Sequence, residues 1–173
     1  MRYITATAFV VLAILTGALG SFMHVQNDCD FPIYCIGSRS NDGIGDATET
    51  IEVPAGDSWR SPLEVLDNDY GSALKCSPEE DTPDDNQYQM EVNSNGKTWL
   101  DLSIVNGDPF TDYERAVYFS KRGLDCPSLE CSPGDNSCEW CPEVGETICD
   151  PPNFITCHDT DADAWLYLCS YGD

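Results

Sequence analysis

The sequence predicts an all-β protein, an antiparallel β-sandwich with a disulfide-rich, loop-dominated C-terminal region. Residues 22–122 contain many short runs of β-type residues separated by turn residues, which is typical of sandwiches and barrels. No 3.6-residue hydrophobic period occurs after the first 20 residues, so no amphipathic helix is expected. Seven of the ten cysteines fall between residues 126 and 169, where bridges and loops replace long apolar runs.

The first 20 residues resemble a signal peptide. Arg2 precedes an almost wholly apolar run over residues 4–19, and small residues favour cleavage after Gly20. The run is shorter than the roughly 20 residues that a membrane-spanning helix needs. We therefore expect a secreted protein, extracellular or in the cell wall, that does not reside in a membrane.

We expect a single domain over residues 21–173, with a β-sandwich core over 21–122 and a cysteine-rich extension over 123–173. An even number of cysteines in an oxidising compartment predicts up to five disulfides. The ten cysteines are Cys29, Cys35, Cys76, Cys126, Cys131, Cys138, Cys141, Cys149, Cys157 and Cys169. The first three precede residue 126 and the other seven follow it; both counts are odd. If every cysteine is bridged, at least one bridge joins the two regions.

Two segments contain residue types that also occur in metal or redox sites. The spacing Cys138-Glu-Trp-Cys141 also occurs in zinc and redox sites, but these require reduced thiolates. Asp159, Asp161 and Asp163 invite a calcium site, yet Ala164 stands where an EF-hand loop needs its sixth-position glycine. We expect disulfides and a solvated acidic loop, with no metal and no cofactor.

The formal net charge is −23, with 31 acidic side chains against 8 basic ones. Such a surface repels phosphate backbones and anionic lipids, which argues against nucleic-acid and membrane partners. It is compatible with cations, basic proteins, and cationic or neutral glycans. The charge is also explained by solubility alone. We expect a monomer.

The strands follow from alternation and turn residues. They are expected over residues 22–26, 31–36, 48–53, 58–65, 73–76, 88–92, 98–105 and 116–119, with a further extended run over 164–168. Residues 39–46 are polar with two glycines, and residues 77–85 contain five acids and two prolines. Both segments predict loops.

For one hairpin, the sequence predicts the loop length and the strand register. A three-residue loop over 94–96 pairs Asn93 with Lys97 and sets Glu91 opposite Trp99. A two-residue Asn-Gly turn mixes apolar and polar side chains on each face, so alternation rejects it. The resulting apolar face contains Tyr88, Met90, Val92, Leu100 and Leu102.

The opposite face of this hairpin carries Glu91, Trp99 and Asp101. In the expected register the two carboxyl-bearing residues are diagonal neighbours, with Cα atoms about 7–8 Å apart. Two carboxylates beside an aromatic ring on an exposed face form a candidate binding site.

Three motifs in order resemble thaumatin-like proteins. They are the opening strand with Asn-x-Cys over residues 22–34, the Pro-Ala-Gly-Asp-Ser-Trp turn within 53–59, and the Leu-Asp-Leu-Ser-Ile-Val-Asn-Gly strand within 99–110. The short loops are similar to a compact fungal branch, the Blastomyces yeast-phase-specific protein family. The resemblance covers about residues 22–120 and implies a β-sandwich core and a fungal source.

The resemblance also implies a site. Larger thaumatin-like proteins have an acidic cleft of a Glu, two or three Asp and an Arg, linked to β-1,3-glucan binding and, in some members, to glucanase activity. By motif position Glu91 matches the cleft Glu and Asp101 the first cleft Asp, whereas Asn106 replaces the next Asp. The Arg has no clear match, and Lys75 is the nearest candidate. The family pattern further implies a disulfide between Cys29 and Cys169.

The sequence thus predicts a non-enzymatic, effector-like interaction protein. Its binding residues are Glu91, Trp99, Asp101 and Asn106, and its expected partner is a cell-wall glycan or a basic protein. The alternative is a β-1,3-glucan-active hydrolase that uses Glu91 and Asp101 as its catalytic pair. The chain has only two histidines, which argues against a Ser-His-Asp or Cys-His site.

Overall fold

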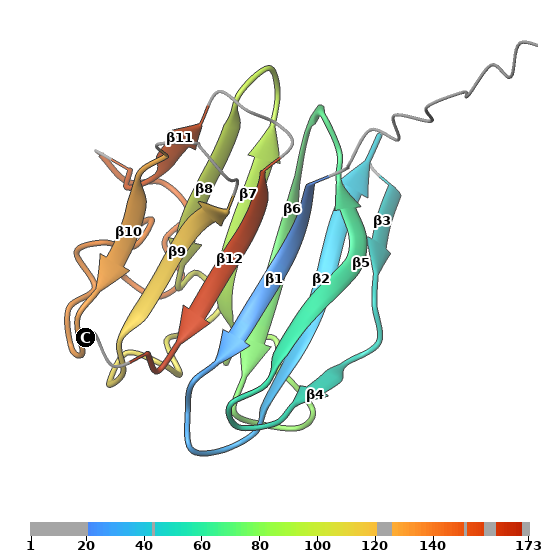
Figure 1. Ribbon diagram of the computed structural model, residues 1–173. Helices are drawn as coiled ribbons and strands as arrows, with labels where there is room; N and C mark the ends of the chain where they lie inside the picture. The colour runs from blue at the N-terminus through green and yellow to red at the C-terminus, as the bar shows by residue number, and fades with distance from the viewer. Residues whose placement is uncertain (1–20, 43, 121–125, 151, 158–161, 171–173) are drawn as a thin grey trace, which may run out of the picture.

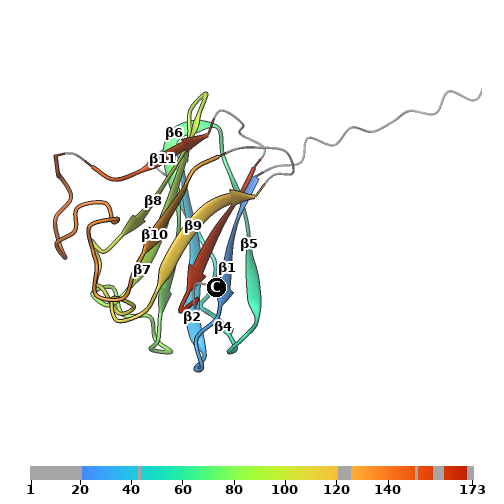
Figure 2. The same cartoon turned by 60° about the vertical axis from the view of Figure 1, so that its left-hand side comes forward.

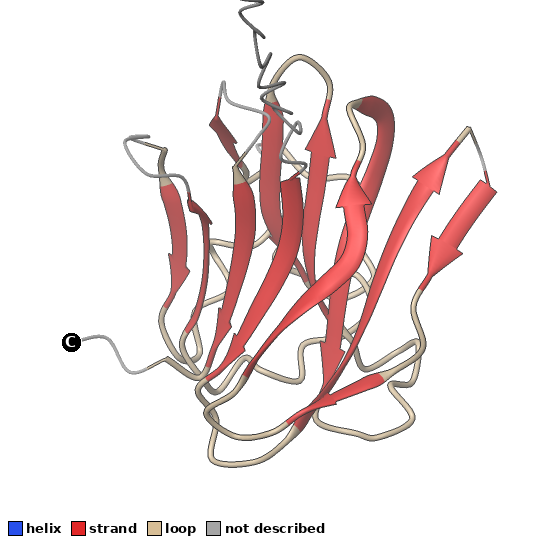
Figure 3. Cartoon of the chain, turned by 45° about the vertical axis from the view of Figure 1, so that its right-hand side comes forward, coloured by secondary structure: helices blue, strands red, loops and turns tan. Residues whose placement is uncertain are grey.

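A computed structural model describes residues 21–42, 44–120, 126–150, 152–157 and 162–170, which form two stacked β-sheets (Figure 1). The first sheet has five strands in the order β10-β9-β12-β1-β5. These are β10 (Ser128–Cys131), β9 (Arg115–Ser120), β12 (Asp163–Leu168), β1 (Ser21–Asn27) and β5 (Ser58–Val65). The all-β prediction is confirmed, and no helix occurs among the described residues (Figure 3).

The second sheet has seven strands in the order β11-β8-β7-β6-β2-β3, with β4 also paired to β2. They are β11 (Ile155–Cys157), β8 (Thr98–Ser103), β7 (Tyr88–Ser94), β6 (Asn68–Ser77), β2 (Ile33–Asn41), β3 (Ile44–Ala47) and β4 (Ile51–Val53). Strand pairs are antiparallel, except that β1 and β12 run parallel.

The core lies between the two sheets because side chains alternate along each strand. Burial alternates at every residue of β1 and β12, so one face of each strand turns inward. Fully buried inward residues include Met23, Leu74, Met90, Leu102, Val117 and Leu166. The opposite face of the seven-stranded sheet carries polar residues and is the surface on which the candidate site lies.

The prediction of a loop over residues 39–46 is wrong. β2 continues to Asn41, and β3 returns beside it as an edge strand. Arg39 lies opposite Asp46, and their side chains form an ion pair at 3.1 Å. Polar and charged residues suit an exposed sheet edge, where they discourage pairing with other chains. Their composition therefore concealed a strand.

The expected faces of the β7–β8 hairpin are present, but the expected register is wrong by two residues. Ser94 pairs with Thr98 and Glu91 lies directly opposite Asp101. The cause is β6, because Asn68 also pairs with Ser94 and extends β7 beyond the expected loop. The Asp67 carboxylate accepts hydrogen bonds from Ser94 Oγ at 3.3 Å and from the Gly96 N–H at 3.2 Å. A two-residue shift leaves every side chain on its expected face.

The C-terminal extension contributes to the sandwich core. β12 lies between β9 and β1, in the middle of the five-stranded sheet, and its buried residues are Ala164, Leu166 and Leu168. A core boundary at residue 122 therefore leaves out a central strand. Between β10 and β11 the chain forms loops on the side of the sandwich where β8 lies (Figure 2).

Five disulfides link all ten cysteines. Cys29 bonds to Cys169, the pair implied by the resemblance, with Cα atoms 4.8 Å apart. This bridge joins the two regions. Cys35–Cys76 connects β2 to β6, and the pairs Cys126–Cys157, Cys131–Cys138 and Cys141–Cys149 close loops within the extension. Cys138 and Cys141 thus belong to different bridges.

Two predicted features lie outside the described residues. They are the signal peptide over residues 1–20 and the first part of the acidic run, residues 159–161. Within the described part of the chain, no helix has the length and apolar character needed to cross a bilayer.

Candidate ligand-binding groove

An open groove of about 640 Å³ crosses the outer face of the seven-stranded sheet. Polar residues of β2, β6, β7 and β8 form its floor, and β3 forms one side. Glu91 and Asp101 both line this groove. The alternation predicted for the hairpin placed these side chains on this face, since residues two apart along a strand point the same way.

The Glu91 and Asp101 side chains are hydrogen-bonded to one another across β7 and β8. Burial, followed by the nearby Glu91 charge, raises the pKa of Asp101 to about 8. Burial also raises the pKa of Glu91, although Asp101, Lys75 and Ser103 act against this. Two carboxyl groups this close do not both ionise readily, so the pair retains one proton near neutral pH. The Asp101 Oδ2 atom is buried.

Basic side chains line the end of the groove toward β3. Lys75 on β6 lies close enough to Glu91 to favour its ionised form. Arg39 is engaged by the Asp46 carboxylate at 3.1 Å and by the Glu64 carbonyl oxygen at 3.2 Å. Lys75, the nearest candidate for the basic cleft residue, thus lies in the groove, and Arg39 and Asp46 are there too.

Aromatic side chains line the opposite end. A hollow of about 320 Å³ adjoins the groove and shares Asn93 and Asp101 with it. Its other walls include Trp99, Trp140 and Phe154. The Phe154 ring lies 4.7 Å from the Trp99 ring and 6.1 Å from the Trp140 ring, measured between centroids. We call these three rings the aromatic wall.

The extension brings two of these rings to the sheet. The backbone N–H of Trp140 donates to the backbone carbonyl oxygen of Leu102 at 2.7 Å. This bond attaches the loop to β8. Asn153 Nδ2 donates to the Glu139 carbonyl oxygen at 3.3 Å and so joins the residue before Phe154 to the residue before Trp140. Sequence reasoning found Trp99 and missed Trp140 and Phe154, because neither lies in a strand with a readable pattern.

A fully buried ion pair anchors the loop that carries Trp140. Arg115 Nη2 on β9 lies 2.8 Å from Glu139 Oε1, and neither side chain is exposed. The Tyr88 hydroxyl also donates to Glu139 Oε1, at 2.7 Å. Arg115 further donates to the carbonyl oxygens of Thr111, Tyr113, Ser132 and Asp135. This network satisfies the guanidinium and fixes the start of the extension against the core.

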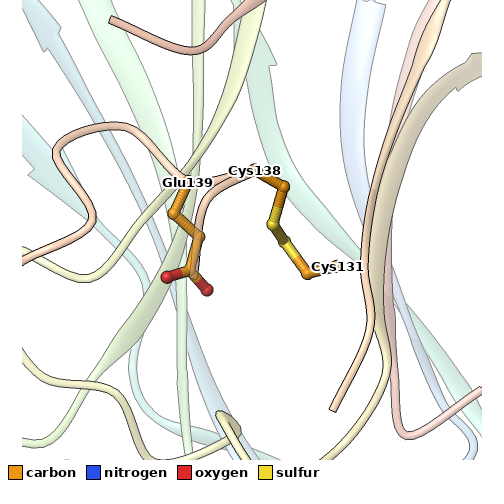
Figure 4. Close-up of side chains that lie close together, drawn as sticks. All are labelled: Cys131, Cys138 and Glu139. Atoms are coloured by element: carbon orange, nitrogen blue, oxygen red, sulfur yellow. A yellow bond between two sulfur atoms is a disulfide. The ribbon is translucent and has the colours of Figure 1, made fainter. Parts of the chain in front are cut away.

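Cys131, Cys138 and Glu139 lie within 4.8 Å of one another and have the side-chain types of a metal site. Figure 4 shows that the two sulfur atoms are bonded to each other beside the Glu139 carboxylate. That carboxylate is also held by Arg115. The cluster therefore lacks the free thiolates that a metal needs.

Asn106 does not line the groove. Its Oδ1 accepts a hydrogen bond from Gln89 Nε2 at 2.6 Å, and its Nδ2 donates to the Asp84 carbonyl oxygen at 2.8 Å. Of the four predicted binding residues, the structure thus brings Glu91, Trp99 and Asp101 together. Asn106 instead supports Gln89, which does line the groove.

The family model described as "Blastomyces yeast-phase-specific protein" matches residues 10–170, so the chain belongs to this family. Among solved structures it is similar to the protein elicitor MoHrip2 from Magnaporthe oryzae, with a TM-score of 0.67 and 19% identity over 87% of this chain and 99% of that chain. It is also similar to the thaumatin-like xylanase inhibitor TLXI, with a TM-score of 0.54 and 13% identity over 86% and 99%. No curated protein sequence matches. These comparisons show a thaumatin-like fold.

Proposed function

We propose that this family member is a secreted, non-enzymatic protein that binds a glycan in the groove of its seven-stranded sheet. One observation carries the proposal: a carboxyl pair at the centre of the groove continues into the aromatic wall, with Asp101 shared by both parts. Sugars offer hydroxyl groups for polar side chains and flat C–H faces for aromatic rings. The groove supplies the polar side chains, and the adjoining hollow supplies the rings. We treat the two as the polar half and the aromatic half of one groove.

The extent of the groove favours an extended ligand. Together the groove and the adjoining hollow reach from β3 at one edge of the sheet to Phe154 next to β11 at the other. Neighbouring strands are about 4.8 Å apart, so the five intervals between these strands span about 24 Å. A small sugar occupies only part of such a length. We therefore expect an oligosaccharide or a polysaccharide chain.

The carboxyl geometry favours binding over glycoside hydrolysis. Glycosidases hold their two carboxyl groups about 5–5.5 Å apart when retaining and about 6.5–9.5 Å apart when inverting. Glu91 and Asp101 are instead in direct hydrogen-bonding contact. This leaves no space between them for a sugar or an attacking water.

An extracellular role is supported by the disulfides and by the structural neighbours. Five bridges are typical of proteins from oxidising compartments. One structural neighbour is described as a protein elicitor and the other as a xylanase inhibitor. Both descriptions concern proteins that act by interaction, and we extend this mode of action to the present chain.

The test of glycan binding compares two variants on immobilised cell-wall polysaccharides and soluble oligosaccharides. Trp99→Ala removes a ring of the aromatic wall, and we expect affinity to fall about fivefold, because one lost aromatic contact costs on the order of 1 kcal/mol. Asp57→Asn changes an exposed acid in a turn outside the groove and should retain wild-type affinity. Equal affinities for the two variants would remove this groove from consideration.

A reducing-sugar assay on a laminarin-type glucan separates binding from hydrolysis. We expect saturable binding and no products from the wild type. Products that disappear in Glu91→Gln would instead establish the glucan-active alternative, in which Glu91 and Asp101 are catalytic.

A further inference from the structure

The aromatic half of the groove holds an acid with no basic partner. Asp101 lines both halves, and among the described residues no ion pair joins it to a basic side chain. Lys75 on β6 acts on Glu91, whereas Arg39 on β2 is already paired with Asp46 on β3. Among the described residues that line the aromatic half, none is basic. A positive charge from outside the chain would therefore complete this end of the groove.

The surroundings of Asp101 favour a cation attached to an apolar ring. Trp99, Trp140 and Phe154 form the walls beside it. Aromatic faces attract ammonium groups and also pack against the C–H face of a sugar. A neutral glycan can pack on the rings and donate hydroxyl groups to Asp101, but it brings no charge to the acid, while a simple cation would leave the rings unused. A sugar that bears an amine uses both.

We propose that the preferred ligand of the groove is a glycan with free amino groups, whose ammonium binds Asp101 while its ring packs on the aromatic wall. This inference rests on the proposed glycan-binding function and names its ligand class. The formal net charge of −23 supports it, because a strongly acidic protein attracts polycations and accelerates their encounter.

Binding of such a ligand should release a proton from the carboxyl pair. In the free protein, Glu91 and Asp101 are hydrogen-bonded to each other, which requires one of them to keep its proton. An ammonium between Asp101 and the rings offsets the repulsion between two ionised carboxylates. Asp101 then loses its proton to the buffer as the ligand binds. Binding and proton release are thus coupled at the same atoms.

The experiment uses the full mature protein and three soluble probes of equal length: a glucosamine oligomer, the N-acetylated form of the same oligomer, and a β-1,3-linked glucose oligomer. Calorimetry at pH 6 in two buffers of different ionisation enthalpy gives affinity and proton exchange together. We expect the glucosamine oligomer to bind about tenfold or more tightly than the other two, the range of one charge-assisted hydrogen bond. We also expect it to release protons.

Two Asp→Asn variants, one in the groove and one outside it, provide the control. Asp101→Asn keeps the side-chain shape, so we expect it to fold, to bind the three oligomers about equally and to release no proton. Asp57→Asn should retain the wild-type preference. Thermal unfolding of both variants, with the five bridges intact, confirms that they are folded.

The outcomes are distinguishable. Equal wild-type affinity for all three oligomers would overturn the preference for amines and leave glycan binding in place. No binding of any oligomer would overturn both proposals. A lysine-rich peptide is the fourth probe, and tighter binding of this peptide than of the glucosamine oligomer would assign the groove to a basic protein instead.

Discussion

The sandwich and the cysteine-rich extension are held together in different ways. The sandwich buries apolar side chains of both sheets at its centre, among them Met23, Leu74 and Leu166. Between residues 126 and 157, the buried apolar residues other than cysteines reduce to Ile155 among those that the structure describes. Three disulfides and the Arg115–Glu139 ion pair take the place of a core there. The part of the extension between residues 126 and 157 is therefore held to the sandwich by a few strong links, and it supplies Trp140 and Phe154 to the groove.

The largest expected effect concerns the bridge between the two regions. Replacing Cys29 and Cys169 with Ser opens a loop with a sequence separation of 140 residues. In the chain-entropy model such a loop contributes about 5 kcal/mol to the free energy of unfolding. Denaturant titration measures the loss. A loss no larger than that of a short bridge in the extension would show that burial alone holds the ends of the sandwich.

The next effect concerns the buried ion pair. Arg115→Met leaves the Glu139 carboxyl without its charged partner, so we expect the free energy of unfolding to fall by about 3–5 kcal/mol. The double variant Arg115→Met/Glu139→Gln removes both charges and should recover part of that loss. Near-ultraviolet circular dichroism monitors whether Trp140 leaves its place. If both variants lose the same stability, the pair does not hold the extension.

Removing a disulfide that closes a short loop should lower the free energy of unfolding by a smaller amount. Cys131 and Cys138 are separated by 7 residues, and the same entropy model assigns their bridge about 2.5 kcal/mol. The double Cys→Ser variant should therefore lose about half as much stability as the Cys29/Cys169 variant. Equal losses would mean that the extension and the sandwich unfold as one unit with comparable dependence on every bridge.

The last prediction concerns how the stability of the sandwich depends on pH. The expected change in the free energy of unfolding for each pH unit is smaller than the losses above. Burial and the Glu91 charge raise the pKa of Asp101 to about 8, so the native state keeps a proton that the unfolded state releases above pH 4. Stability is thus highest below about pH 4 and declines as pH rises toward 8, by at most about 1.4 kcal/mol per pH unit for this proton. Asp101→Asn should flatten the decline measured by denaturant titration from about pH 5 to 8. Asp57→Asn should retain the wild-type slope, and equal slopes in both variants would contradict the shared proton.

Local pattern was sufficient for the fold class and for part of the site. Alternation in residues 88–105 assigned Glu91, Trp99 and Asp101 to one face, because a strand repeats every two residues whatever its neighbours are. It did not give the register, which depends on Asn68 at the start of β6 and on Asp67 just before it. It also missed β3, since an exposed edge strand carries the same polar residues as a loop.

The sequence by itself determined that this chain is an acidic, all-β, disulfide-rich protein with two carboxyls and a tryptophan on one strand face. These properties follow from composition, parity and the two-residue period, which need no knowledge of distant contacts. Tertiary structure alone decided that Asp101 pairs directly with Glu91 and that Trp140 and Phe154 join Trp99. It also decided that Arg115 reaches across 24 residues to Glu139. The physical reason is that contacts between residues far apart in the chain depend on how whole sheets and loops pack, and no local pattern records this.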